Sequence, residues 1–181
     1  MFQYKTAPKI ETDHLIIRVV NEDDAKDFFE FCSDSKVCEF LTFNSYKSLS
    51  QTKRIINNMI NAYIHGSDVN FSIVLKSTQK VIGSISLNFK KETNEAEVGY
   101  LLNSSYWNNG FASEALKSVI TIAFDYYNVD VLLASYVKDN VASEKLLKKN
   151  NFKIYTVIEN GFCKNNKYYD LIKCYRYKWY L

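Results

Sequence analysis

The chain has 181 residues, of which 47% are hydrophobic and 24% charged, a composition typical of a single globular domain. Its 23 basic and 20 acidic residues leave a net charge of +3, too small to indicate nucleic-acid binding. No apolar run reaches the roughly 20 residues that a membrane span requires, and the opening MFQYKTAPKIETD lacks the apolar core of a secretory signal. We therefore expect one cytoplasmic domain over residues 1–181, with no membrane or direct nucleic-acid partner.

Hydrophobic periodicity predicts elements in the order βααβββαβαββ. In chain order these are a strand over 14–20, helices over 22–33 and 50–65, strands over 70–77, 80–89 and 95–102, a helix over 110–127, a strand over 131–137, a helix over 140–150, and strands over 152–159 and 167–180. Asn21 is placed to cap the first helix and Gly66 to end the second. The pattern predicts an α+β fold with a mixed, mostly antiparallel central sheet and helices on both faces.

The four cysteines carry no C-x-x-C pair, and only two histidines are available to help bind a metal. A chain of this size does not need disulfides to hold its core. We therefore expect structural or incidental thiols and no metal cofactor.

The segment SSYWNNGFASEAL, residues 104–116, joins a predicted strand to a predicted helix and contains one of only five glycines. The first N–H groups of such a helix have no acceptor within it and lie at the positive end of its dipole. Gly110 lets a ligand approach the backbone closely, and Asn108 and Asn109 tolerate left-handed backbone. These features suit a phosphate group, although a plain turn explains the short pattern as well. Because G-K-S/T and G-x-G-x-x-G are both missing, neither a P-loop nor a dinucleotide fingerprint is indicated.

Four segments in order resemble the GNAT superfamily of acetyl-CoA-dependent N-acetyltransferases, and more narrowly its ribosomal-protein N-terminal (Rim-type) branch. They are TDHLIIRVVNEDDAKDFFEF, KVIGSISL, EAEVGYLLNSSYWNNGFASEAL and VKDNVASEKLLKKNNFK, and the resemblance spans roughly residues 12–178. It implies a GNAT-like form of the predicted fold, acetyl-CoA as cosubstrate, no metal, and a monomer or homodimer. It also favours a phosphate-binding role for the glycine turn over a plain turn.

The resemblance assigns cofactor contacts position by position. The family's pyrophosphate turn falls on Trp107–Ala112, with N–H groups from Asn109 to Ser113 as donors. Lys145 would meet a cofactor phosphate or remain a solvated surface charge. The implied cofactor-binding residues are Leu101 and Leu102 for the pantetheine arm, Trp107, Asn108, Asn109, Gly110, Phe111, Ala112 and Ser113 for the pyrophosphate, and Asn140 and Lys145.

Amide formation requires a neutral amine, a polarised thioester carbonyl and a thiolate that can leave. The candidate base is Glu97, acting directly or through a water, with Glu95 on the same strand face ranked second. The main-chain N–H near Leu102 would stabilise negative charge on the carbonyl oxygen. Many family members use a Tyr to protonate the thiolate, but Leu147 stands at that position, and Ser143 is the nearest Rim-type substitute. The predicted catalytic residues are thus Glu97 and Ser143.

The acceptor that the sequence favours is the N-terminal α-amine of a protein, possibly a ribosomal one. Its unperturbed pKa near 8 requires less help than the value near 10.4 of a lysine. A polyamine or aminoglycoside is an alternative, weakly disfavoured because no acidic cluster exists beyond Glu22–Asp24. A non-catalytic acyl-CoA sensor is another, supported by Leu147. The aromatic segments 40–46 and 161–170 fall where the family's substrate loops lie, although packing against the sheet is their simpler interpretation. Asn151, which replaces a usual glycine, still tolerates positive φ.

Overall fold

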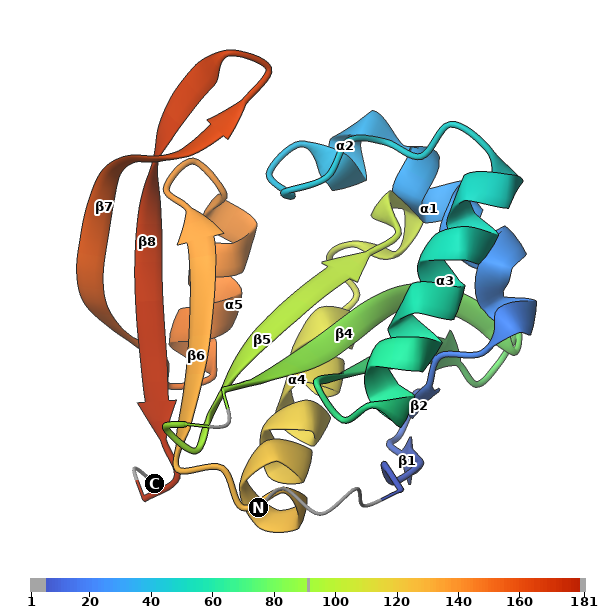
Figure 1. The fold of residues 1–181 in the computed structure, drawn as a ribbon, viewed down its shortest axis with the longest axis horizontal. Helices are drawn as coiled ribbons and strands as arrows, with labels where there is room; N and C mark the ends of the chain where they lie inside the picture. Colours follow the sequence, from blue (N-terminus) through green and yellow to red (C-terminus); the bar gives the residue numbers. More distant parts are fainter. Residues whose placement is uncertain (1–5, 91, 180–181) are drawn as a thin grey trace.

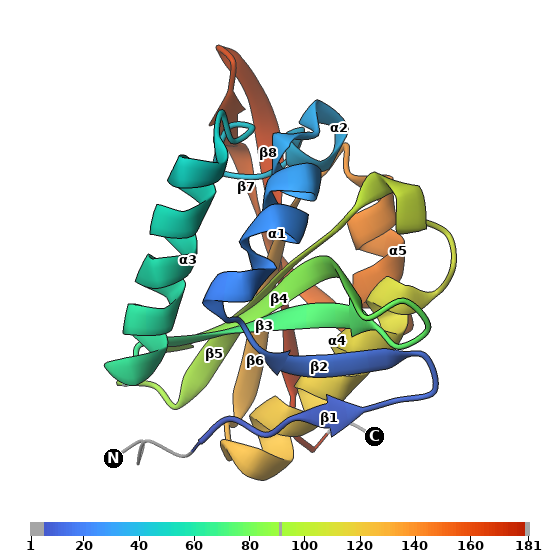
Figure 2. The ribbon, with the colours of Figure 1, turned by 90° about the vertical axis from the view of Figure 1, so that its right-hand side faces the viewer.

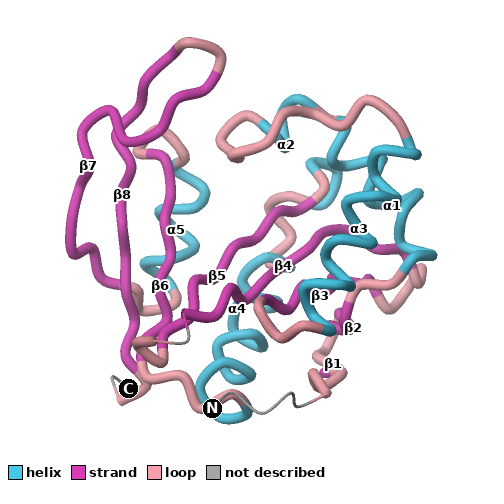
Figure 3. Tube along the Cα trace, in the orientation of Figure 1, coloured by secondary structure: helices cyan, strands magenta, loops and turns pink. Residues whose placement is uncertain are grey.

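The structure, a computed structural model, describes residues 6–90 and 92–179 and contains an eight-stranded sheet (Figure 1). The strands are β1 (Ile10–Glu11), β2 (Leu15–Val19), β3 (Asp68–Leu75), β4 (Lys80–Lys90), β5 (Glu95–Leu102), β6 (Val131–Val137), β7 (Lys153–Lys164) and β8 (Lys167–Tyr177). The α-helices are α1 (Ala25–Ser33), α2 (Ser35–Cys38), α3 (Leu49–Ile64), α4 (Phe111–Thr121) and α5 (Val141–Lys149). Figure 3 shows how the helices and strands follow one another along the chain.

The predicted fold class is confirmed, and the predicted order lacks three short elements, β1, α2 and the 3-10 turn Ser104–Tyr106. β1 has two residues and α2 four, too few to produce a periodic pattern. The helix expected over 110–127 is α-helical to Thr121 and continues as a π-helical turn over Ile122–Tyr126. The strand expected over 167–180 ends at Tyr177, and Tyr180 lies outside the described residues.

The strands lie in the order β1-β2-β3-β4-β5-β6-β8-β7. Strands β3, β4 and β5 form the expected antiparallel meander, whereas β5 and β6 are parallel. A parallel neighbour requires a long crossover connection, which α4 supplies. The parallel ladder contains only three residue pairs and ends at Glu97 and Leu133. Beyond this pair the two strands diverge (Figure 1), which divides the sheet into two halves.

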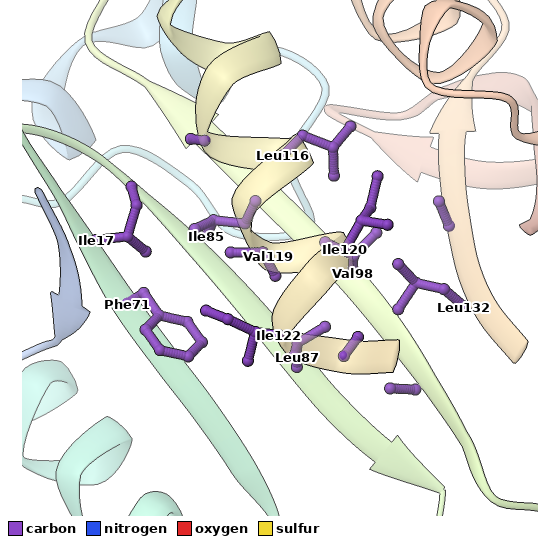
Figure 4. Packing of buried hydrophobic residues seen from close by; sticks show 14 of the residues in the cluster. Ile17, Phe71, Ile85, Leu87, Val98, Leu116, Val119, Ile120, Ile122 and Leu132 are labelled. Atoms are coloured by element: carbon purple, nitrogen blue, oxygen red, sulfur yellow. The ribbon is translucent and has the colours of Figure 1, made fainter. Parts of the chain in front are cut away.

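Helices cover both faces of the sheet, with α3 on one side and α4 and α5 on the other (Figure 2). The larger core lies between α4 and the sheet (Figure 4), and its buried side chains include Ile17, Phe71, Ile85, Leu87, Val98, Leu116, Val119, Ile120, Ile122 and Leu132. A second cluster lies beneath α1 and α3. Because side chains alternate along β5, Val98 points into the larger core, and Glu97 points to the opposite face.

The helix boundaries have the expected local causes. Asn21 and Asp24 form a capping box around the 3-10 turn Glu22–Asp24, which leads into α1. Gly66 has a φ of 66° and follows the end of α3, as expected. No helix among residues 6–90 and 92–179 is long and apolar enough to cross a membrane.

All four cysteines are free thiols. Cys32, Cys38 and Cys174 are buried, whereas Cys163 on β7 is exposed. Burial raises the pKa of the Cys32 thiol to about 12 and that of Cys174 to about 11. These two thiols therefore stay protonated and unreactive at neutral pH.

A buried ion pair fixes the start of α1 against the sheet. Arg18 on β2 donates from Nη2 to Asp24 Oδ1 at 2.6 Å and from Nη1 to Oδ2 at 2.9 Å. Ser72 Oγ on β3 and the Asn21 N–H also donate to Asp24 Oδ2, at 2.6 and 3.0 Å. The Asp24 side chain is only 3% exposed, so its charge depends on these partners instead of water.

Arg18→Met is expected to lower the free energy of unfolding by about 3–5 kcal/mol, because it leaves the Asp24 carboxylate buried without its cation. Lys148→Met is the control, since it removes an exposed pair with Glu144 on α5 and should cost about 0.3–0.5 kcal/mol. Urea unfolding of both variants measures the difference. Equal losses would contradict a special role for the buried pair.

Candidate active site

The divergence of β5 and β6 opens a cleft of about 850 Å³. The cleft is also bordered by the turn before α4, the start of α5, the loop after α2 and the β7–β8 hairpin. The site residues expected from the sequence that line it are Glu97, Leu101, Leu102, Trp107, Asn108, Gly110, Phe111, Ala112, Ser113, Asn140, Ser143 and Lys145. Residues from three separate segments of chain, 97–102, 107–113 and 140–145, are thus brought to one place.

The turn before α4 leaves the start of the helix free. Asn108 and Gly110 have φ values of 63° and 84°, the left-handed conformation that Asn and Gly adopt most readily. Gly110 occupies the N-cap position, and no side chain caps the helix. The first-turn N–H groups of Phe111, Ala112 and Ser113 therefore remain available to a ligand. Ser113 Oγ is buried and has no hydrogen-bond partner among the described residues.

Two side chains stabilise this turn, and Trp107 also joins it to the end of β5. Trp107 Nε1 donates to the Leu102 carbonyl at 2.8 Å. Asn109 Nδ2 donates to the carbonyls of Tyr106 and Trp107 at 3.3 and 3.0 Å. Asn109 therefore stabilises the turn from within. It is absent from the cleft lining, and it does not adopt the positive φ that its residue type would allow.

The direction of the backbone hydrogen bonds along β5 differs from the expectation that the main chain of Leu101 faces the cofactor. The Asn103 N–H donates to the Ile82 carbonyl on β4 at 2.8 Å. Because backbone direction alternates along a strand, the main-chain groups of Leu101 face β4, and those of Tyr100 and Leu102 face the cleft. Leu101 lines the cleft through its side chain. Tyr100 and Leu102 are thus the β5 residues with main chain available beyond the last β5–β6 pair.

Glu97 lies at the vertex of the cleft, in the last residue pair before β5 and β6 separate. Its Oε1 accepts a hydrogen bond from Ser135 Oγ on β6 at 2.9 Å. This bond orients the carboxylate and leaves Oε2 free for another partner. Glu95, the second candidate, pairs with Lys90 and Val131 where the strands are still joined, and it is not among the cleft-lining residues.

On the opposite wall, Asn140 and Ser143 begin α5. Asn140 Oδ1 accepts from the Ser143 N–H at 3.1 Å, so its carbonyl oxygen caps the helix and its amide nitrogen is left to face the cleft. The Ser143 side chain lies near the Tyr100 phenol, and both residues line the cleft. Burial raises the Tyr100 pKa to about 12, which keeps the phenol protonated. Leu147 is 1% exposed and belongs to the core.

The two aromatic segments meet at the mouth of the cleft. Lys164 Nζ on β7 donates to the carbonyls of Leu41, at 2.8 Å, and Phe43 in the loop after α2. The Phe40 and Tyr169 rings meet edge to face at 6.2 Å, and both Phe40 and Phe162 line the cleft. The simpler interpretation, packing against the sheet, holds for Tyr46, which is buried beneath α1 and α3. Phe40 and Phe162 are half-buried and also line the cleft.

Sequence reasoning missed several lining residues, among them Tyr100, Ser135 and Lys173. Tyr100 carried a usable signal, because it lies between Glu97 and Leu102 on a strand already assigned to the site. Ser135 and Lys173 carried none, because the pairing of β5 with β6 brings Ser135 to Glu97, and the pairing of β6 with β8 brings Lys173 beside Ser135. The turn that contains Asn151 keeps a positive φ of 61°, as expected.

Comparisons with known proteins agree on one family. A family model described as an acetyltransferase (GNAT) domain matches residues 14–153. YoaA of Bacillus subtilis (strain 168), described as an uncharacterized N-acetyltransferase, is 29% identical over 164 residues, which are 90% of this chain and 93% of that protein. A second N-acetyltransferase of that description, p20 of Bacillus licheniformis, is 31% identical over 142 residues, covering 78% of this chain and 80% of its own.

Solved structures show the same fold at low sequence identity. A GNAT-family acetyltransferase from Bacillus anthracis superposes with a TM-score of 0.85 at 20% identity, over 94% of this chain and 99% of its own. RimL, a ribosomal L7/L12 α-N-protein acetyltransferase solved with coenzyme A, has a TM-score of 0.86 at 19% identity, over 96% and 98%. The ribosomal-protein-S5-alanine acetyltransferase from Vibrio fischeri has a TM-score of 0.85 at 20% identity, over 94% and 97%.

These neighbours share the fold of this chain. The matched segment, residues 14–153, contains the β5–β6 opening and the turn that starts α4, so it carries the features from which the cleft is built. The chain therefore belongs to the GNAT family of acetyltransferases, and it is an N-acetyltransferase.

Proposed function

We propose that this enzyme transfers the acetyl group of acetyl-CoA to the N-terminal α-amine of a protein, by direct attack while both substrates are bound. The observation that carries the proposal is that the cleft can be entered from two different sides. One side is the uncapped start of α4, and another is the gap between the loop after α2 and the β7–β8 hairpin. Two ligands can enter by these routes and meet beside Glu97. The assigned substrates of RimL and of the S5 acetyltransferase support a protein N-terminus.

The residues around α4 fit a cofactor that bears a diphosphate. The uncapped N–H groups of Phe111–Ser113 and the unpartnered Ser113 hydroxyl are donors suited to phosphate oxygens. A Cβ placed on Gly110 would have no atom within 4 Å, so the space beside this backbone is open. The main chain of Tyr100 would pair with an amide of a pantetheine arm, whereas the Leu102 carbonyl is already occupied by Trp107. Bound acetyl-CoA supplies the activated acetyl thioester.

Residues of this chain divide the chemistry among them. Glu97, oriented by Ser135, accepts the proton of the incoming amine directly or through a water. The Leu102 N–H faces the cleft and stabilises negative charge on the carbonyl oxygen. The Ser143 hydroxyl and the protonated Tyr100 phenol, which both line the cleft, donate hydrogen bonds to the leaving sulfur. No cysteine is needed as a nucleophile.

A cationic small acceptor, such as a polyamine, fits the cleft less well. Among the described lining residues, Glu97 is the one carboxylate, and Lys36, Lys145 and Lys173 are lysines. Like charges repel in a partly desolvated cleft, so a polycation would lose affinity there. A protein N-terminus brings a single amine, which Glu97 can accept.

Gly110→Trp is expected to weaken acetyl-CoA binding by about tenfold or more, because a side chain enters the open space and φ of +84° is unfavourable for it. Gly110→Asn is the matched variant, since Asn tolerates left-handed backbone and is smaller, and it should bind more tightly than Gly110→Trp. Titration calorimetry with acetyl-CoA measures both. Unchanged affinity in Gly110→Trp would place the cofactor elsewhere.

Glu97→Gln is expected to lower kcat/KM for an N-terminal peptide by about 10²-fold or more, because the amide cannot accept the proton. Acetyl-CoA affinity should remain unchanged. Glu95→Gln is the control, since Glu95 lies on the same strand face and does not line the cleft. The release of free thiol follows turnover. A similar loss in both variants would argue against Glu97 as the base.

The pH profile of kcat/KM should rise through the pKa of the acceptor amine, near 8, and then level off up to pH 10. Tyr100 adds no falling limb in this range, because burial raises its pKa to about 12 and the phenol keeps its proton. Tyr100→Phe should lower kcat by about threefold to tenfold, the value of one hydrogen bond, and keep the shape of the profile. A wild-type kcat/KM that falls between pH 8 and 10 would contradict a Tyr100 phenol that stays protonated in this range.

A further inference from the structure

A second cavity, of about 620 Å³, lies between the same two segments that border the mouth of the cleft. It is lined by residues of α2 and the following loop on one side and by the β7–β8 turn on the other. Tyr169 lines this cavity, and its ring contacts Phe40 at 6.2 Å and Phe162 at 6.2 Å. Because Phe40 and Phe162 line the cleft, the two spaces adjoin at this aromatic contact.

Both spaces carry an excess of positive charge. Three lysines and one glutamate line each of them within the described part of the chain. They are Lys36, Lys145 and Lys173 with Glu97 in the cleft, and Lys47, Lys164 and Lys167 with Glu39 in the second cavity. The chain as a whole is nearly balanced, with 23 basic and 20 acidic residues, so the local excess is a property of this region.

The lysines keep their charge available. Lys164 is held by two neutral carbonyls, which fix its position without cancelling its charge. Lys167 Nζ lies 4.4 Å from the centre of the Tyr169 ring. It therefore lies where the cleft and the second cavity adjoin. The ion pairs found among residues 6–90 and 92–179 involve none of the six lysines.

Lys173 places a cation one strand beyond the residue that orients the proposed base. It pairs with Ser135 across β6 and β8, and Ser135 donates to Glu97. Paired residues on neighbouring strands project from the same face, so Lys173 extends toward the route by which an acceptor would reach Glu97. An acceptor of negative charge would be attracted along this whole path.

We infer that the acceptor is a protein N-terminus followed by acidic residues, with the amine beside Glu97 and the acidic segment extending past Tyr169 into the second cavity. The inference rests on the proposed function and narrows its substrate class. An extended chain advances about 3.3–3.6 Å per residue, so successive side chains of the acceptor can meet successive lysines. Lys47 and Lys167 become specificity-determining residues at a distance from the chemistry.

Two peptides of equal length test the inference. Both begin Ser-Ala and end in an amide, and one carries four Asp and the other four Asn at about the third to sixth positions. We expect wild-type kcat/KM to favour the Asp peptide by about tenfold or more at low ionic strength, and the preference to shrink as salt is added. The Asn peptide serves as the reference for each variant.

The double variant Lys47→Glu, Lys167→Glu should abolish or invert this preference, because it replaces two attractions by repulsions. Lys117→Glu, an exposed change on α4 away from both spaces, should retain it. Unchanged acetyl-CoA affinity, by calorimetry, confirms that each variant is folded.

Equal turnover of both peptides by the wild type would overturn this inference and leave N-terminal acetylation standing. A preference that survives in the double variant would also overturn it, since the selection would then arise outside the second cavity. Turnover of neither peptide, with acetyl-CoA still bound, would refute the proposed function and this inference with it.

Discussion

The β5–β6 ladder stops at Glu97 and Leu133, and the rest of the site depends on this interruption. Backbone N–H and C=O groups beyond that pair have lost the strand partner that a continuous sheet would supply. A ligand rich in amides can take that partner's place. The same interruption puts a carboxylate at the vertex, leads β5 into the glycine turn and leaves α4 uncapped. The absence of β5–β6 pairing beyond Glu97 therefore accounts both for the unpaired backbone groups that can bind a ligand and for the position of Glu97.

The two halves of the sheet are connected by side-chain contacts on both sides of the opening. Below the vertex, α4 packs against strands of the meander and against Leu132 on β6 (Figure 4). Above it, Lys164 joins the hairpin to the loop after α2, aided by the Phe40–Tyr169 contact. These contacts connect the two halves of the sheet on either side of the opening. Its upper fastening also brings the lysines of both segments together.

The need for positive φ at particular positions explains why the turn before α4 could be predicted from residue types. Among residues 6–90 and 92–179, eight non-glycine residues have positive φ, and all but Gln79 are asparagines, so this glycine-poor chain uses Asn where left-handed backbone is required. Asn108 and Asn151 belong to this group, and both were expected from residue type. Asn109 does not follow this pattern. Its residue type tolerates a positive φ, but in the packed turn Asn108 adopts that conformation and Asn109 does not.

The sequence by itself determined the strand–turn–helix unit, the helix caps and the face on which Glu97 lies, because each follows from periodicity or from contacts within a few residues. Only the tertiary structure decided that Leu102 and Tyr100, in place of Leu101, direct their main chain into the cleft. It also decided the Ser135–Glu97 bond and the Lys164–Leu41 bond, which join residues 38 and 123 positions apart. Such pairs depend on strand order and hydrogen-bond phase, and no local pattern encodes either.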